Sequence, residues 1–287
     1  MEISQHIAAI ERDGELMSAA ADQAGLDAPV PSCPPWKVRE LLKHQGYVHR
    51  WATAYVADRQ PDRVPRLSEP ELLAAGPADA DLLEWFRAGH AALTQTLRTA
   101  DPGLQCWTFL PAPSPLAFWA RRQAHETAIH RVDAQQAAGH VSPFPADFAA
   151  DGIDELIMGF FGRGGADGVG GADGAGGPDE ADGQRTLLVV AADAGQAWHV
   201  TLTADGSRAA HVERDRDRPD GPGPDGRGPG GRGPDGGGGA GATVRGPASA
   251  VYLLLWNRAT AADGAVTIAG DAELVKSWPE GMRVTWG

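Results

Sequence analysis

The stretch that decides the fold is WARRQAHETAIHRVD, residues 119–133. Its pattern predicts the middle of a long helix that runs from about Pro115 to Ala138. Glu126 and His130 stand four residues apart, and a helix of about 3.6 residues per turn places residues with this spacing on one face. A carboxylate and an imidazole arranged in this way can bind one divalent metal ion.

This helix carries two stripes of neighbouring side chains. The stripe of Glu126 and His130 also holds Trp119, Gln123, Asp133 and Ala137. The second stripe consists of Ala120, Ala124 and Ala128. The pattern alone does not decide which stripe faces inward. The segment HETAI is not the metalloprotease motif HExxH, because Ile129 stands where that motif needs its second histidine, and we expect His125 to point away from the pair.

Periodic apolar residues predict three long helices ahead of this one, over residues 4–25, 36–58 and 79–100. A proline-containing connection, 59–78, separates the second from the third. In the second helix a 3-4-3-4 spacing is typical of the inner seam of a bundle and is formed by Leu41, His44, Val48, Trp51 and Tyr55. We therefore expect the His44 side chain to lie in the core. A short fifth helix is predicted at 147–162.

The rest of the chain is predicted to consist of short strands and helices. The strands are expected at 185–192, 198–203, 207–214, 243–245 and 266–268, and the helices at 247–260 and from Asp271 onward. Two glycine-rich segments, 162–184 and about 215–242, are expected to be flexible insertions. The acidic glycine run within the first lacks the regular period of calcium-binding repeats. The prediction is an α+β protein with a helical domain at 1–161, a linker at 162–184 and a small α+β domain at 185–287.

The composition excludes several classes of protein. The 287 residues are 42% hydrophobic and include nine tryptophans, which is enough for a substantial core. The net charge of −13 argues against a nucleic acid or an anionic membrane as partner. The amino terminus has no secretory pattern, and no apolar run approaches the ~20 residues of a spanning helix. Two cysteines are too few for a disulfide framework or a cysteine-rich zinc site, so we expect a cytoplasmic protein with reduced thiols.

The candidate metal ligands are His44, Glu126 and His130. Two neutral imidazoles and one carboxylate inside a bundle would leave a coordination position open for water or substrate, as in catalytic zinc sites. The alternative is that His44 is a core histidine with an ordinary hydrogen-bond partner and that Glu126 and His130 form a surface pair. His49 is more typical of a surface residue, or of one that supports a ligand, than of a ligand itself.

Other polar residues leave more than one interpretation open. Asp133 could orient a ligand imidazole, bind Arg50 or Arg131, or remain a solvated acid near a helix end. Arg258 could be a cation at a helix end or an anion-binding group that serves the other domain. Cys33 and Cys106 are interpreted as structural or incidental thiols, because nothing near them in sequence would lower the pKa of either.

Three segments resemble the mycothiol-dependent maleylpyruvate isomerase family, which belongs to the DinB-like metalloenzyme superfamily. They are VPSCPPWKVRELLKHQGYVHRWA (30–52), RRQAHETAIHRVDAQQAAG (121–139) and GPASAVYLLLWNR (246–258). The resemblance spans nearly the whole chain in the same order and is weakest across the glycine-rich insertions. It implies an amino-terminal DinB-like four-helix bundle with a smaller α/β carboxy-terminal domain.

The resemblance also implies a set of functional residues. In this family one metal ion, usually taken as zinc, is held by a histidine of the second helix and by an acid and a histidine of the fourth. The matching positions are His44, Glu126 and His130. The family also uses an arginine of the second domain near the metal, for which Arg258 is the best match and Arg245 the reserve candidate for binding the cofactor thiol.

The implied function is a metal-dependent enzyme with mycothiol as thiol cosubstrate, either an isomerase or an S-transferase. A metal-activated thiolate would attack a small electrophilic substrate, and Arg258 would steady a carboxylate of substrate or thiol. The alternatives are a non-catalytic binding or regulatory protein that retained the bundle, and a metal-dependent hydrolase. We expect a monomer without nucleic-acid or membrane partners.

Overall fold

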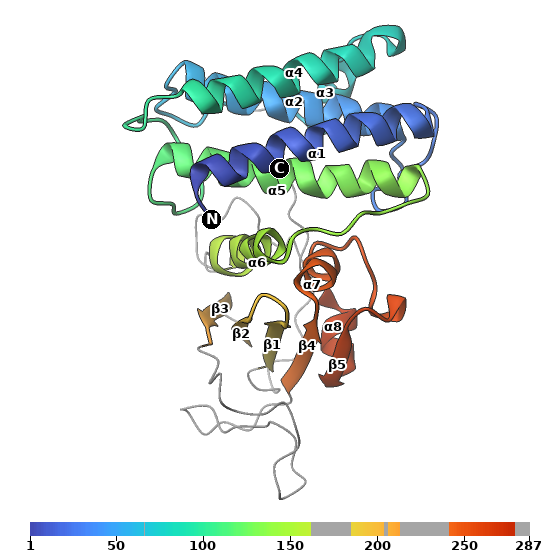
Figure 1. Ribbon diagram of the computed structural model, residues 1–287, viewed down its shortest axis with the longest axis vertical. Coiled ribbons are helices and arrows are strands. Elements are labelled where there is room, and N and C mark those ends of the chain that lie inside the picture. The colour runs from blue at the N-terminus through green and yellow to red at the C-terminus, as the bar shows by residue number, and fades with distance from the viewer. Residues whose placement is uncertain (66, 162–184, 204–205, 213–240, 279–287) are drawn as a thin grey trace, which may run out of the picture. The chain divides into compact units, whose positions relative to one another are not determined.

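Four long helices build the first of two compact units in the chain (Figure 1). They are α1 (Ile3–Ala24), α2 (Val38–Ala57), α4 (Asp79–Thr99) and α5 (Pro115–Ala137). The computed structural model describes residues 1–278 except 66, 162–184, 204–205 and 213–240. The first unit comprises Met1–Phe144 and the short segment Trp256–Arg258. All four helices begin and end close to their predicted limits.

The bundle is closed by contacts around a ring of helices. Helix α1 packs mainly against α5 and α2 against α4, while contacts of α1 with α4 and of α2 with α5 complete the ring. The side chain of His44 is buried on the seam of α2, as predicted. In α5 both the alanine stripe and the stripe of Glu126 are buried, which explains why the pattern of this helix did not single out an inner face.

Two local features differ from the prediction. The connection 59–78 contains a short helix, α3 (Glu69–Ala75), which begins at a capping box between Ser68 and Glu71. The fifth helix, α6 (Ala146–Asp154), continues as a π-helical segment over Glu155–Phe160. Seven residues among prolines give too little periodicity to predict a helix, and π-helical geometry has no sequence signature of its own.

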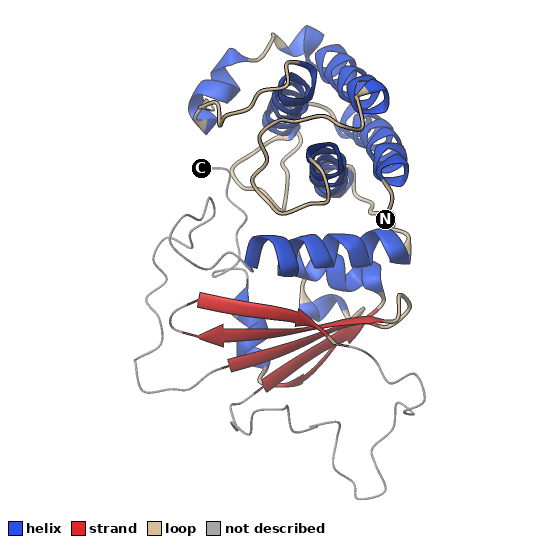
Figure 2. Ribbon diagram, turned by 90° about the vertical axis from the view of Figure 1, so that its left-hand side faces the viewer, coloured by secondary structure: helices blue, strands red, loops and turns tan. Residues whose placement is uncertain are grey.

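A five-stranded mixed sheet is the centre of the second unit (Figure 2), which comprises the described residues within Pro145–Leu255 and Ala259–Trp286. Its strands are β1 (Arg185–Ala191), β2 (Gln196–Thr203), β3 (Gly206–His211), β4 (Gly241–Gly246) and β5 (Thr267–Gly270). The spatial order is β3-β2-β1-β4-β5, and only β1 and β4 are parallel. Helix α7 (Ala248–Leu255) packs on α6 and against β1 and β4, and α8 (Ala272–Lys276) contacts β4 and β5.

Alternating residues of the inner strands fill the core of the second unit. Val189 of β1 stands opposite Trp198 of β2 and Val244 of β4, and all three side chains are fully buried. The predicted α+β architecture, a helical bundle followed by a smaller α/β part, is confirmed. The predicted domain limits stay a prediction, and Gly241, which the sequence placed in the second insertion, pairs in β4.

The flexibility expected of the two glycine-rich insertions concerns residues that lie largely outside the described part of the chain. The first glycine-rich insertion and most of the second, residues 213–240, lie outside the described residues. Among the described residues, none of the helices has the length and apolarity needed to span a membrane.

Candidate metal centre

His44 of α2 meets Glu126 and His130 of α5 in the interior of the bundle. One ligand atom from each residue lies within 4.8 Å of the ligand atoms of the other two. Glu126 Oε1 is 3.5 Å from His44 Nε2 and 3.4 Å from His130 Nε2. All three residues are buried. The structure therefore brings together the three side chains that the sequence singled out.

The remaining polar atom of two of these residues already has a partner. Arg122 Nη2 donates to Glu126 Oε2 at 2.8 Å, so that Oε1 is the carboxylate oxygen left to face the imidazoles. His130 Nδ1 lies 2.8 Å from Asp133 Oδ2. Glu126 Oε1 and His44 Nε2 are buried atoms without a hydrogen-bond partner among the described residues. Buried polar atoms are rarely left in this state, which suits atoms that bind a metal ion.

The donor set fits a divalent metal ion. Two imidazole nitrogens and one carboxylate oxygen are ligands that zinc accepts, with bonds of about 2.0–2.2 Å. Two ligands at such distances in a tetrahedral arrangement are about 3.3–3.6 Å apart. The distances of 3.5 Å and 3.4 Å from Glu126 Oε1 to the two imidazole nitrogens lie within that range.

The electrostatics of the cluster favour a carboxylate in its centre. Burial alone would raise the pKa of Glu126, but His130, His44 and Arg122 together hold that pKa well below its ordinary value. Burial lowers the pKa of His44, although Glu126 acts in the opposite direction. Burial also opposes the charged form of His130, but Asp133 and Glu126 raise its pKa. The cluster is therefore built around an ionised Glu126 and a neutral His44.

An indole ring borders the cluster. The ring of Trp36 lies 4.9 Å from the ring of His44 and 6.4 Å from that of His130, measured between centroids. Trp36 Nε1 donates to Glu69 Oε1 of α3 at 2.8 Å. The unpredicted helix α3 thus helps to fix an aromatic side chain beside two of the candidate ligands.

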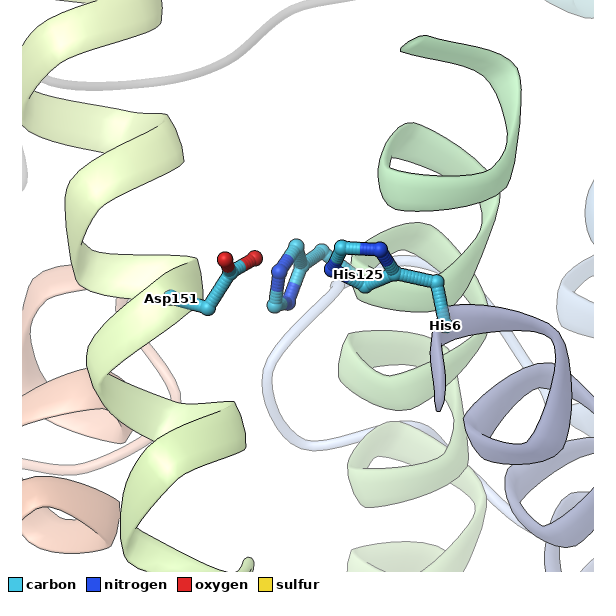
Figure 3. Close-up of side chains that lie close together, drawn as sticks. All are labelled: His6, His125 and Asp151. Carbon is cyan, nitrogen blue, oxygen red and sulfur yellow. The ribbon is translucent and has the colours of Figure 1, made fainter. Parts of the chain in front are cut away.

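Two further histidines of the sequence analysis lie elsewhere. His49 is fully buried and hydrogen-bonded to Gln45 at 2.8 Å and to Thr127 at 3.0 Å, so its interpretation as a surface residue was wrong. The error arose because α2 is covered on more than its seam face. His125 is also buried, and its ring stands edge-on to that of His6 of α1, with the centroids 6.1 Å apart (Figure 3).

Asp133 is fully buried, so its interpretation as a solvated acid was wrong. The predicted contact with a candidate ligand imidazole is present, because His130 Nδ1 lies 2.8 Å from Asp133 Oδ2. The two predicted arginines pair elsewhere: Arg50 donates to the carbonyl oxygens of Gly46 and Trp85, and Arg131 lies 3.4 Å from Asp13. The arginine that pairs with Asp133 is Arg258.

Arg258 lies just beyond α7 in the segment assigned to the first unit. Its Nε and Nη2 atoms donate to the two oxygens of Asp133, each at 2.9 Å. Its Nη2 is also 3.4 Å from Cys33 Sγ. Burial raises the pKa of the Cys33 thiol to about 11, in keeping with its interpretation as an unreactive thiol.

Arg245 lies on β4 in the second unit. It lines a shallow pocket of about 300 Å³ together with Asp193 and Thr267. Cys106, like Cys33, is a free and partly exposed thiol.

Three residues of the site were not predicted from the sequence. Arg122 precedes Glu126 by four residues, and this spacing is a signal that the sequence contained. Ser32 donates to Asp133 from about a hundred residues away, and Trp36 borders the cluster from the same segment before α2. No local pattern reveals such long-range contacts.

A helical bundle with a buried His–Glu–His cluster, followed by a small mixed sheet with its own helices, defines an α+β protein with a candidate metal centre. Residues 7–135 match the family model of the mycothiol maleylpyruvate isomerase N-terminal domain, and residues 147–277 match the model of the corresponding C-terminal domain. The chain belongs to the mycothiol-dependent maleylpyruvate isomerase family, as the resemblance predicted, and is therefore an enzyme of an isomerase family.

Two solved structures share this fold. They are the crystal structure of the mycothiol-dependent maleylpyruvate isomerase and that of a histidine-to-alanine mutant of it. Each has a TM-score of 0.57 and 12% sequence identity, over 94% of this chain and 93% of the other. No curated protein sequence matches the chain.

Proposed function

We propose that this protein is a metal-dependent isomerase that uses mycothiol as thiol cosubstrate, with His44, Glu126 and His130 as the metal ligands. The observation that carries the proposal is the convergence of three buried ligand atoms, two of which have no hydrogen-bond partner among the described residues. Membership of the isomerase family supplies the thiol and the reaction class.

A divalent metal ion held by these residues, most simply zinc, would supply the Lewis acidity that lowers the pKa of a thiol to near neutrality. The protein contributes the arrangement around it. Arg122 holds one oxygen of Glu126 and leaves the other to act as a ligand. The buried position of the cluster limits the access of water, which strengthens electrostatic interactions inside it.

The substrate proposed is a small electrophilic alkene that carries carboxylate groups, such as maleylpyruvate. Addition of the thiolate sulfur to one alkene carbon, with a proton taken up at the other, converts the double bond into a single bond. Rotation about that bond, loss of the proton and departure of the sulfur then give the other isomer and return the thiol. Thiol and proton are thus regenerated, and no oxidant or reductant is consumed.

Two arginines are proposed to contribute to the reaction. Arg258 contributes from beside the cluster through its pair with Asp133, and Arg245 is the reserve candidate for binding the cofactor thiol. The S-transferase alternative uses the same residues but releases the thiol adduct as product. The family match favours the isomerase.

The deciding experiment measures metal content and turnover in the full-length protein purified without chelator. We expect about one equivalent of a divalent metal ion and isomerisation of maleylpyruvate that requires added mycothiol. His130→Ala should remove both while leaving the helical circular dichroism signal largely unchanged. The exposed His140, just beyond the end of α5, supplies the matched control: His140→Ala should retain both.

Each alternative function predicts a different result. Metal below about a tenth of an equivalent would favour a non-catalytic binding protein. Turnover of an ester or amide substrate with metal but without thiol would favour a hydrolase. Unchanged metal binding by His130→Ala would remove His130 from the site.

A further inference from the structure

Asp133 accepts an unusual number of hydrogen bonds for one carboxylate. Ser32 Oγ donates to Oδ1 at 2.5 Å, and Arg258 Nε donates to the same oxygen at 2.9 Å. Oδ2 receives Arg258 Nη2 at 2.9 Å and His130 Nδ1 at 2.8 Å. The side chain is fully buried, and its burial is compensated by the charge of the arginine.

The guanidinium of Arg258 is largely occupied by these contacts. Nε and Nη2 form a two-pronged pair with the Asp133 carboxylate, and Nη1 donates to the carbonyl oxygen of Trp256 at 2.9 Å. A guanidinium that donates two hydrogen bonds to one carboxylate and a third to a carbonyl oxygen has few donors left for a second carboxylate. The effect of Arg258 on the reaction must therefore pass largely through Asp133.

We propose that Arg258 and Asp133 are positioning residues that fix the tautomer and orientation of His130. An ionised carboxylate can only accept hydrogen bonds, so the neutral imidazole beside it must carry its hydrogen on Nδ1. The lone pair of the ring is then on Nε2, the atom that lies 3.4 Å from Glu126 Oε1. In the neutral ring, Asp133 thereby places the hydrogen on Nδ1 and leaves the lone pair on the metal-facing nitrogen.

This assignment rests on the proposed function only for the presence of a metal ion, because the tautomer exists with or without one. It replaces the expectation that Arg258 steadies a substrate carboxylate directly. Ser32, in the segment before α2, and Arg258, beyond α7, hold the same carboxylate from parts of the chain far apart in sequence.

The first test is the tautomer of His130 in the metal-free full-length protein. Nitrogen-15 NMR at alkaline pH, with the signal assigned by its absence in His130→Gln, should show hydrogen on Nδ1 in the wild type. In Asp133→Asn the amide oxygen is expected at the Oδ1 position, where Ser32 and Arg258 both donate, and the amide nitrogen should then donate to His130 Nδ1. The hydrogen of His130 should consequently move to Nε2.

The second test is zinc affinity, measured by competition with a chelator. Loss of a residue that orients a metal-bound histidine typically weakens affinity by about 10–100-fold. We expect a loss of that order in Asp133→Asn and a smaller loss in Arg258→Met. Arg258→Lys keeps the positive charge but cannot donate two parallel hydrogen bonds to Asp133, so its zinc affinity should lie between those of Arg258→Met and the wild type.

Asp13 provides the matched control. It is another fully buried acid of the same unit, paired with Arg12 at 2.8 Å and with Arg131 at 3.4 Å. Asp13→Asn should alter the melting temperature but neither the tautomer of His130 nor the zinc affinity.

Different outcomes overturn different claims. An unchanged tautomer and unchanged zinc affinity in Asp133→Asn would overturn the role of Asp133. An Arg258→Met variant with wild-type zinc affinity and only a raised KM would show that Arg258 contacts substrate, and would overturn its positioning role. A wild type with the expected tautomer but no zinc binding would refute the proposed function and leave the positioning of His130 intact.

Discussion

Gln123 is a polar side chain buried without a hydrogen-bond partner among the described residues. It is fully buried in α5, and neither Nε2 nor Oε1 has a hydrogen-bond partner among the described residues. A buried polar group without a partner costs about 1–3 kcal/mol. Replacement by leucine, which has a similar volume, should therefore raise the free energy of unfolding by about 1 kcal/mol or more, as measured by urea denaturation.

Gln135 is the control for this substitution, because it is equally buried in the same helix but well paired. Its Nε2 donates to Ser142 Oγ at 3.0 Å, and its Oε1 accepts from the backbone nitrogen of Ser142 at 3.1 Å. Gln135→Leu should lower the stability. Equal losses in the two variants would show that the amide of Gln123 is also paired.

His49 should make the stability of the metal-free protein depend on pH. Burial holds the pKa of His49 well below its ordinary value, whereas the pKa in the unfolded chain is about 6.5. Below that pH the unfolded chain binds a proton that the folded chain does not. Stability is then lost as the pH falls, by up to about 1.4 kcal/mol per pH unit.

Comparison of the wild type with His49→Gln isolates this contribution, because His44 titrates in both proteins. Between about pH 6.5 and pH 5 the free energy of unfolding should fall less steeply in the variant. Equal slopes would mean that His49 takes up its proton in the folded state.

The site residues differ in how far the sequence could reveal them. The spacing of Glu126 and His130 and the seam position of His44 follow from helix geometry. Their residue types suggested one metal site, and the family resemblance supported it. The partners of Asp133 could not be read in the same way. Ser32 and Arg258 come from distant parts of the chain, and no local pattern specifies which buried acid a distant arginine will meet.

At the level of elements, the contact between α1 and α4 depends on a glycine. A Cβ atom on Gly14 would lie 2.2 Å from Nε2 of His90, whose ring is buried and whose Nε2 donates to the carbonyl oxygen of Ile10 at 2.9 Å. Gly14→Ala should therefore cost about 1–3 kcal/mol by overpacking, although alanine is the better helix former. Thermal and urea denaturation would measure the loss.

The double variant tests the cause. Once His90→Ala has removed the ring, Gly14→Ala should become stabilising by up to about 1 kcal/mol, the difference in helix propensity. A substitution that still destabilises in this background would mean that the clash with His90 is not the reason.

Elements with a long periodic pattern were predicted well, and short or fully buried ones were not. Helices α1, α2 and α4 each present a periodic apolar face over five or more turns. Helix α3 has only seven residues, which is too short for an apolar period to predict it. Helix α5 is buried on both of its stripes, so its periodicity did not show which face points inward. The strands were predicted as short strand-like runs, and β2 shows the pattern most clearly, because Trp198, Val200 and Leu202 alternate with polar residues.

At the scale of the whole molecule, metal binding should appear as a gain in stability. A ligand that binds only the folded chain stabilises it by about 2.7 kcal/mol when its free concentration is a hundred times Kd. For a chain of this size each kcal/mol corresponds to about 2–4 °C, so zinc at that excess should raise the melting temperature by about 5–10 °C. Binding of zinc to histidines of the unfolded chain would reduce the shift. Differential scanning calorimetry with and without zinc measures the shift, and addition of chelator should reverse it.

His44→Ala lacks one of the three ligand atoms and should show little of the shift, whereas the exposed-histidine variant His140→Ala should show all of it. A shift of equal size in His44→Ala and in the wild type would place the stabilising ion elsewhere in the protein.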